Sequence, residues 1–339
     1  MAKIKEIAEK MNISVSTVYK ALSDAEDVNP ETKKKILKTA INMGYVAKRK
    51  GDNHKRICVF IDQPEDNHVQ YFDYEVMMAF KRNAIHSGHE VSIMSLDYTL
   101  NHSKSFDELM DEYQFDGAVI LGLSNFNPYF EQLKTTSHPV VILDNFLDNP
   151  MVASVCCDNM KGMKLAIDHL VDLGHTRIGF INGQNDAYVC KERLGGYISS
   201  IALRGIAFDP ELVCNGNFTE ESAAPLARHL VSMGVTAIMC CNDMLAIGAI
   251  KELMGMGLNV PGDISVVGFD DIKLSSYITP KLTTVHTDLS QMGEKLFIVL
   301  ELMMKDNRLD MSLQPSYLEV RESTSTVNSR AEWLDSRSG

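Results

Sequence analysis

The sequence predicts an α/β protein with a small all-helical module at its N-terminus and a larger body of parallel β-sheets arranged in two lobes. Three observations lead to this fold class. Helical patterns fill residues 1–46, short apolar runs alternate with helical stretches from Ile57 onward, and basic residues gather early in the chain. With 339 residues, 45% of them hydrophobic, the chain can build more than one packed core.

The N-terminal module has the pattern of three short helices. Apolar residues recur at helical spacing over residues 3–11, and Ser14 can cap a second helix over Val15–Leu22. A third helix is expected between Pro30 and Gly44. Two helices joined by a short turn, with a third packed behind them, form a helix-turn-helix whose second helix enters the DNA major groove.

The second helix carries the side chains expected to read DNA. Val15 offers a methyl surface to a thymine methyl group, and the Ser16 hydroxyl can donate to or accept from a base edge. Lys20 lies a little over one turn further on and can reach a guanine or a phosphate. Residues expected to contact phosphates are Thr17, Tyr19, Asn29 and Lys33.

The charge distribution supports a DNA-binding head on a body that does not touch DNA. The formal net charge of −12 would by itself argue against nucleic acid. Residues 1–56, however, carry 13 Lys and Arg against 7 Asp and Glu, whereas the rest of the chain carries 20 against 38. The acidic body would be repelled by a phosphate backbone, so only the head is expected to dock.

The body alternates strands and helices, which predicts parallel sheets covered on both faces. Expected strands are Ile57–Asp62, Val91–Ser95, Gly117–Leu121, Val140–Leu143, Ser154–Cys157, Arg177–Ile181, Thr236–Cys240 and Ile264–Phe269. Expected helices include Glu75–His86, Met160–Leu173, Lys191–Leu203, Ala223–Met233 and Met244–Met256. The body is long for one such sheet, so two lobes fit better.

Ligands of doubly wound sheets bind beyond the carboxyl ends of the strands. The polar residues at those positions are Asp62, Asp144, Asn242, Asp243, Asp270 and Asp271. No phosphate loop, nucleophile elbow, dinucleotide fingerprint or paired-histidine motif accompanies them. We therefore expect no enzyme, no catalytic residue, no cofactor and no metal. Seven cysteines without a Cys-x-x-Cys motif, and no apolar leader or span, predict a cytoplasmic protein with reduced thiols.

Both parts of the chain resemble the lactose/galactose repressor (LacI/GalR) family. The head segments that carry the resemblance are IKEIA at 4–8, ISVSTVYKAL at 13–22, VNPET at 28–32 and MGY at 43–45. The body segments are SVCCDN at 154–159, LGHTRIGFI at 173–181, RLGGY at 193–197, CNDMLA at 241–246, PGDISVVGFDDI at 261–272 and PKLTTV at 280–285. The body of that family is similar to periplasmic sugar-binding proteins.

The resemblance implies a domain plan. Residues 1–46 form the head, 47–56 a tether, and 57–322 a two-lobed effector-binding and dimerisation domain. Lobe 1 is expected over about 57–158 with a return near 287–315, and lobe 2 over about 159–285 with 316–322. Residues 323–339 are expected to be a mobile tail.

The resemblance also implies effector-binding residues. Arg193 matches an arginine that forks onto ligand hydroxyls or a carboxylate, and Asp270 matches an aspartate that accepts from hydroxyls. Asp144 and Asn242 match polar positions of the pocket, while Tyr71 and Phe72 lie in the loop where the family places an aromatic ring. The alternative readings are a structural salt bridge between lobes for Arg193 and Asp270, and core packing for Tyr71 and Phe72.

The tether departs from the family. Its members have Tyr-x-Pro-Asn followed by a hinge helix whose leucine wedges into the minor groove, but Ala47 and His54 stand at the proline and leucine positions here. Without the wedge we expect a flexible basic tether in which Lys48 and Arg49 contact phosphates.

The implied function is a homodimeric transcriptional repressor that binds a near-palindromic operator on double-stranded DNA under the control of a small sugar-like effector. Within the same class, a purine or sugar phosphate acting as corepressor is the alternative. From other classes, a cytosolic sugar-binding protein and a nucleotide-handling enzyme stay open. The sequence leaves open whether the effector releases or promotes DNA binding.

Overall fold

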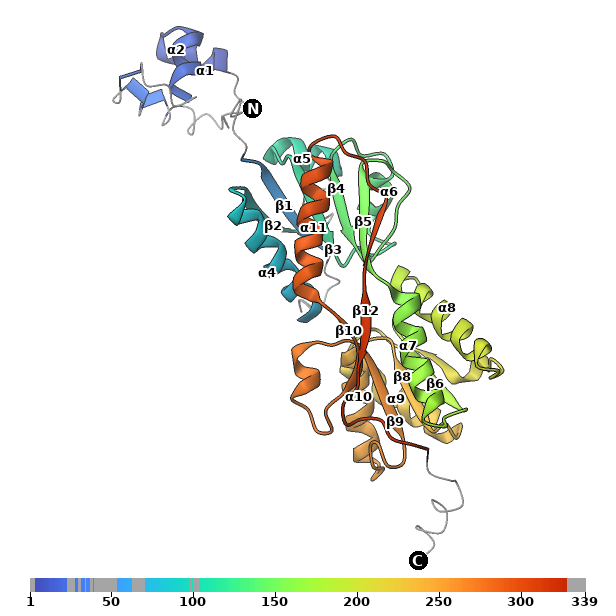
Figure 1. Cartoon of the computed structure of the whole chain (residues 1–339). Coiled ribbons are helices and arrows are strands. Elements are labelled where there is room, and N and C mark those ends of the chain that lie inside the picture. The colour runs from blue at the N-terminus through green and yellow to red at the C-terminus, as the bar shows by residue number, and fades with distance from the viewer. Residues whose placement is uncertain are drawn as a thin grey trace, which may run out of the picture. The chain divides into compact units, whose positions relative to one another are not determined.

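The computed structural model describes residues 4–22, 28–29, 32–33, 35–36, 39, 54–62, 71–97, 99, 101 and 104–327. The chain divides into two compact units, Met1–His54 and Lys55–Gly339 (Figure 1).

The N-terminal unit is helical. Helices α1 (Ile4–Met11) and α2 (Val15–Leu22) pack on each other, and the described residues from 32 to 39 are helical as well. The Ser14 side chain accepts a hydrogen bond from the backbone N–H of Thr17 at 3.0 Å, which caps α2 as the sequence predicts. The small core consists of Ile7, Ala8, Val18, Ala21 and Ile36.

The larger unit contains two six-stranded sheets. The first has the order β11-β5-β4-β3-β1-β2, and every neighbouring pair is parallel. Its strands are β1 (Arg56–Ile61), β2 (Glu90–Ser95), β3 (Gly117–Leu121), β4 (Val140–Leu143), β5 (Val152–Cys157) and β11 (Met311–Gln314).

Helices cover both faces of this sheet and complete lobe 1. The two longest, α4 (Tyr71–His86) and α11 (Leu289–Met303), pack side by side on one face. On the other face α5 (Phe106–Tyr113) and α6 (Pro128–Leu133) enclose a separate apolar cluster around Phe60. Because both faces are buried, β1, β3 and β4 are apolar along nearly their whole length.

Lobe 2 is built around the second sheet, whose order is β12-β10-β9-β8-β6-β7 and in which only the β10–β12 pair is antiparallel. Its strands are β6 (Ile178–Asn182), β7 (Val213–Asn215), β8 (Ala237–Cys240), β9 (Ser265–Asp270), β10 (Thr283–Thr287) and β12 (Ser316–Glu319). Its helices form two packed pairs, α7 (Asn159–Asp172) with α8 (Tyr188–Leu203), and α9 (Glu220–Ser232) with α10 (Asp243–Gly255).

The chain crosses between the lobes where strands of one sheet lead into elements of the other (Figure 1). The crossings follow β5, β10 and β11, so α11 and β11 return to lobe 1 after almost all of lobe 2. The two lobes are therefore interleaved along the chain, with three crossings between them. Such a connection permits the lobes to reorient about a few backbone segments.

Two boundary expectations need correction. Lys55 and Arg56 do not belong to a tether: Arg56 begins β1, and the Lys55 carbonyl accepts from the Glu90 backbone N–H at 2.9 Å. Residues 323–327 are not a mobile tail either. The Ser323 hydroxyl donates to the Val266 carbonyl at 2.6 Å, and the Val327 N–H donates to the Leu173 carbonyl at 3.0 Å. Residues 328–339 lie outside the described part.

Within the described ranges, no helix is long and apolar enough to cross a membrane.

Candidate functional site

The face of α2 expected to read DNA is open to solvent. Val15 and Tyr19 are 49% and 44% exposed, and Ser16 and Lys20 are exposed too, while Val18 on the opposite face is fully buried. The Thr17 hydroxyl lies 2.7 Å from that of Ser14, so it also contributes to the cap.

The remaining head positions are only partly described. Asn29 is exposed, and its carbonyl accepts from the backbone N–H of the half-buried Lys33 at 2.9 Å. Lys48 and Arg49 lie outside the described residues. The DNA contacts of all these side chains therefore stay predictions.

The body's candidate effector site is centred on Arg193, which α8 carries into the interior. The side chain is only 3% exposed, and its guanidinium carbon lies 3.7 Å from the ring centre of Phe269. A planar cation on an aromatic face gains both stacking and electrostatic attraction.

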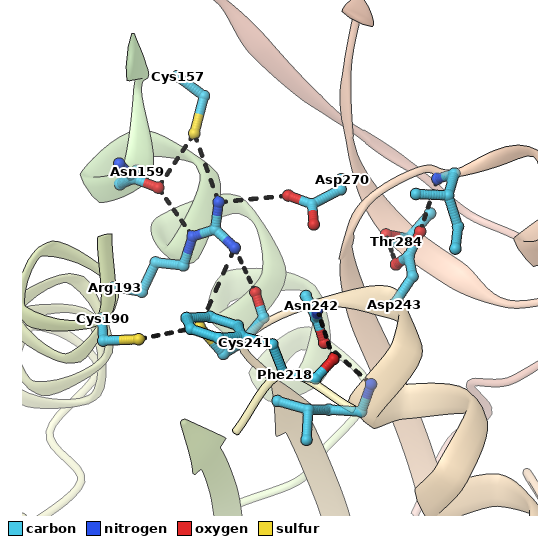
Figure 2. Close-up of polar contacts among 12 residues, drawn as sticks. Cys157, Asn159, Cys190, Arg193, Phe218, Cys241, Asn242, Asp243, Asp270 and Thr284 are labelled. Carbon is cyan, nitrogen blue, oxygen red and sulfur yellow. Dashed lines mark hydrogen bonds and ion pairs between the residues drawn. The ribbon is translucent and has the colours of Figure 1, made fainter. Parts of the chain in front are cut away.

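The guanidinium of Arg193 already uses most of its hydrogen-bond donors (Figure 2). Nε donates to Asn159 Oδ1 at 2.8 Å, Nη2 pairs with Asp270 Oδ1 at 3.2 Å, and Nη1 donates to the Cys241 carbonyl. The Cys157 sulfur lies 3.6 Å from Nη2. A ligand that binds Arg193 must therefore replace one of these contacts.

The Arg193–Asp270 ion pair lies within lobe 2, because α8 and β9 belong to the same lobe. It is thus not the salt bridge between lobes that the sequence left open as an alternative. Asp270 ends β9 with φ +103° and Asp271 follows with φ +56°, a left-handed pair of non-glycine residues. Such strained backbone persists where surrounding contacts enforce it and is frequent at ligand sites.

Asp144 approaches the same cluster from lobe 1, directly after β4, and is also left-handed with φ +53°. Its Oδ1 is buried and has no hydrogen-bond partner among the residues that the structure describes. Burial raises the pKa of Asp144 to about 6, against the opposing effect of Arg193.

Asp73, in the first turn of α4, joins this group and was not predicted from the sequence. Burial and repulsion from Asp144 raise its pKa to about 7. Burial also raises the pKa of Asp270 well above its ordinary value, although Arg193 acts in the opposite direction. The cluster therefore holds more acidic groups than the single buried cation Arg193 can neutralise.

Asn242 has a structural role in this conformation. Its Oδ1 accepts from the Leu245 N–H at 2.9 Å, which caps α10, and its Nδ2 donates to the Phe218 carbonyl at 3.1 Å (Figure 2). The neighbouring Asp243 accepts from Ser275 Oγ at 2.6 Å and from Thr284 Oγ1 at 2.5 Å. Both side chains stabilise the edge of lobe 2, and the effector contact expected for Asn242 stays a prediction.

Tyr71 and Phe72 begin α4 rather than lying in the loop before it. Phe72 is half-buried and packs against the main core, which favours the core-packing alternative for this residue. The Tyr71 side chain and the loop over 63–70 lie outside the described residues.

A hydrogen-bond chain links the lobes beside Asp144. Asn145, which follows it, donates through Nδ2 to Asn125 Oδ1 at 3.0 Å. Asn125 Nδ2 in turn donates to the carbonyl of Asp186, ahead of α8 in lobe 2, at 2.8 Å. No sequence signal marked these asparagines, because residues from separate loops meet only in the folded chain.

Comparison with known proteins matches both units of the chain. Residues 3–48 match the model of bacterial regulatory proteins of the lacI family, and residues 167–324 match that of a periplasmic binding protein-like domain. The HTH-type transcriptional repressor CytR of Escherichia coli K12 is 30% identical over 307 residues, 88% of this chain and 89% of its own. The HTH-type transcriptional repressor PurR of Aliivibrio fischeri MJ11 is 30% identical over 339 residues, 97% and 99% of the two chains.

Solved structures show the same fold. The transcriptional regulator CelR in its cellobiose complex has a TM-score of 0.70 at 24% identity and covers 95% of this chain and 100% of its own. The lac repressor dimer bound to operator and the anti-inducer ONPF also has a TM-score of 0.70, at 23% identity, over 96% and 99% of the chains.

These matches cover the helix-turn-helix head and the two-lobed body together, which disfavours a sugar-binding protein or a nucleotide-handling enzyme as alternatives. The chain therefore belongs to the lacI family of bacterial regulatory proteins and is a DNA-binding transcriptional repressor.

Proposed function

We propose that the repressor is controlled by an uncharged, hydroxyl-rich effector that binds where Asp144 of lobe 1 faces the Arg193–Asp270 pair of lobe 2. The observation that carries this proposal is the buried Asp144 Oδ1 without a partner. A buried acceptor of this kind is normally satisfied, and a hydroxyl group supplies the missing donor.

The charge of the cluster argues against a phosphorylated corepressor. Asp73, Asp144 and Asp270 surround a single buried arginine whose donors are largely taken. A phosphate would find no free cation to pair with there, because the donors of Arg193 are already bonded within the protein. Hydroxyl groups would donate to the carboxylates. Two solved neighbours are named as sugar complexes, one with cellobiose and one with ribose.

Binding is proposed to set the relative orientation of the lobes and, in a homodimer, the spacing of the two heads on a near-palindromic operator. An exposed apolar stripe on α4 and β2 supports a dimer surface in lobe 1. Tyr74, Met78 and Ile85 are 52%, 40% and 52% exposed, and Ile93 on the edge strand β2 is 45% exposed.

We further propose that the protein acts by binding rather than by catalysis. We also propose that it acts in the cytoplasm, because all seven cysteines are free thiols.

The test starts from an operator selected from a random duplex pool by the purified full-length protein. Affinity for that operator is then measured with D-ribose, cellobiose, adenosine, hypoxanthine and ribose 5-phosphate. We expect an uncharged polyhydroxy compound to change operator affinity, and Asp144→Asn to abolish its binding. Asp172→Asn, an exposed acid on α7, is the matched control. A response to ribose 5-phosphate alone, or an effector that binds Asp144→Asn unchanged, would overturn the proposal.

A further inference from the structure

The chain enters the body from the DNA-binding head at Lys55, the first residue of the larger unit. The Lys55 carbonyl accepts from the Glu90 N–H at 2.9 Å, and the Lys55 N–H donates to Nδ1 of His89 at 3.1 Å. The next residue is held too, because the Arg56 N–H donates to Asp116 Oδ2 at 2.9 Å. The imidazole of His89 therefore contacts the residue at which the body begins.

The turn that ends α4 positions His89. Gly88 has φ +83°, and the His89 N–H donates to the Ala84 carbonyl at 3.0 Å, which is the pattern of a helix that ends on a left-handed glycine. The His89 residue is only 7% exposed. Its ring centre lies 5.8 Å from that of Phe297 on α11. The imidazole is thus held by packing inside lobe 1 and is not a surface group.

The two ring nitrogens of His89 face different partners. Nδ1 accepts from the Lys55 N–H, so the proton of the neutral ring is on Nε2. Nε2 lies 3.7 Å from Oε1 of Glu301, in the last turn of α11, and no hydrogen bond is found for it among the described residues. The carboxylate attracts the Nε2 proton, which favours the tautomer in which Nδ1 accepts from Lys55.

We propose that His89 is a positioning residue for operator binding. It is buried and acts through Lys55, which it holds at the point where the segment leading to the head leaves the body. A head with a fixed attachment point can reach its half-site over a limited range of half-site spacings only, and release of Lys55 widens that range. The inference rests on the homodimer proposed above but not on the effector.

Operator affinity of the full-length protein tests the proposal, on the selected operator and on versions with half-sites moved apart by one or two base pairs. His89→Phe keeps a ring against Phe297 but cannot accept from Lys55. It should lower the affinity ratio between selected and altered spacings about fivefold, the size of one net hydrogen bond. His89→Asn offers an amide oxygen in place of Nδ1 and should keep most of the ratio. His138→Phe is the matched control, since its Nε2 lies 3.6 Å from Asp111 Oδ1 in the same lobe.

The thermal midpoint, measured beside the spacing ratio, separates positioning from a structural role. A lower midpoint of His89→Phe with the wild-type ratio would overturn the inference. A ratio lowered equally in His89→Phe and His89→Asn would also overturn it, because the acceptor for Lys55 would not be the cause. Glu301→Gln is the second variant if His89→Phe does not fold. Its side chain is 33% exposed, and it should lower the ratio by a smaller factor, whereas an unchanged ratio would count against the inference.

Failure of the dimer is distinguishable from failure of this inference. A wild type without a preferred half-site spacing would overturn both. A wild-type preference that persists unchanged in His89→Phe would overturn the role of His89 alone.

Discussion

The two sides of the candidate effector site differ in how completely their polar groups are satisfied. On the lobe 2 side, Arg193 is held by Asn159, Asp270 and a backbone carbonyl before any ligand arrives. On the lobe 1 side, Asp144 keeps a buried oxygen without a partner. The lobe 2 side of the site is therefore held in place before a ligand binds. The lobe 1 side has a buried acceptor to which a bound molecule can donate a hydrogen bond.

The largest expected effect on stability comes from removing Arg193 on the lobe 2 side. Arg193→Met leaves Asp270 buried without its cation and should lower the free energy of unfolding by about 3–5 kcal/mol. Urea denaturation measures it. Arg204→Met, directly after the end of α8, removes ion pairs at the surface and should leave the free energy of unfolding almost unchanged. An equal loss of unfolding free energy in the two variants would show that the buried ion pair matters no more than the exposed ones.

On the lobe 1 side, removing the carboxylate of Asp144 should raise the free energy of unfolding. Asp144→Asn removes an acid whose burial raises its pKa to about 6, so the free energy of unfolding at pH 8 should rise by about 1–2 kcal/mol. The same denaturation experiment checks it, with the exposed Asp172→Asn as the reference. A destabilised Asp144→Asn protein would mean that the carboxylate is already well solvated or paired.

The pH dependence sharpens the same comparison. The pKa values of Asp144 and Asp73 are raised to about 6 and about 7, above roughly 3.9 in the unfolded chain. The folded state therefore holds protons that the unfolded state releases. This stabilisation is complete below about pH 4 and is lost as the pH rises through 6 and 7. Stability measured from pH 5 to 8 should fall, and the double variant Asp73→Asn/Asp144→Asn should show a flatter profile. An unchanged slope would contradict these assignments.

The smallest expected effect concerns the contact between the two sides. Asn125→Ala removes the hydrogen bond to the Asp186 carbonyl and the one accepted from Asn145, whose Nδ2 keeps its bond to the Leu123 carbonyl. It should cost about 0.5–1.5 kcal/mol of stability. Hydrogen exchange should become faster around residues 123–126 and 186–189, at the two ends of this contact. Asn215→Ala, at the exposed end of β7, is the control and should leave these segments protected. Identical exchange in both variants would show that the contact does not hold the lobes.

Continuous apolar patterns made much of the fold predictable. The bounds expected for β3, β4 and α2 coincide with the observed ones. Strands β7, β10, β11 and β12 were missed, because they are short and none contains a continuous apolar run. Residues 323–327 misled for a related reason: their hydroxyls suggest a solvated tail, but Ser323 and Ser325 bond to the lobe 2 core.

The candidate site was predictable where the end of a strand or a family pattern marked it. Arg193 and Asp270 lie in recognisable segments and meet as an ion pair. Asp73 was missed because nothing in the pattern of α4 shows that its first turn approaches Asp144. Asn242 has the polar side chain expected at a strand end, but sequence alone does not distinguish a ligand contact from a helix cap.

The interleaving of the two lobes along the chain has a consequence during synthesis. The apolar face of β1, β3, β4 and β5 leaves the ribosome with α4, but α11 follows only from Leu289, more than a hundred residues after Cys157. At bacterial elongation rates the nascent lobe 1 keeps that face open for roughly ten seconds, while lobe 2 is synthesised except for β12. During that interval the exposed apolar face can be bound by chaperones.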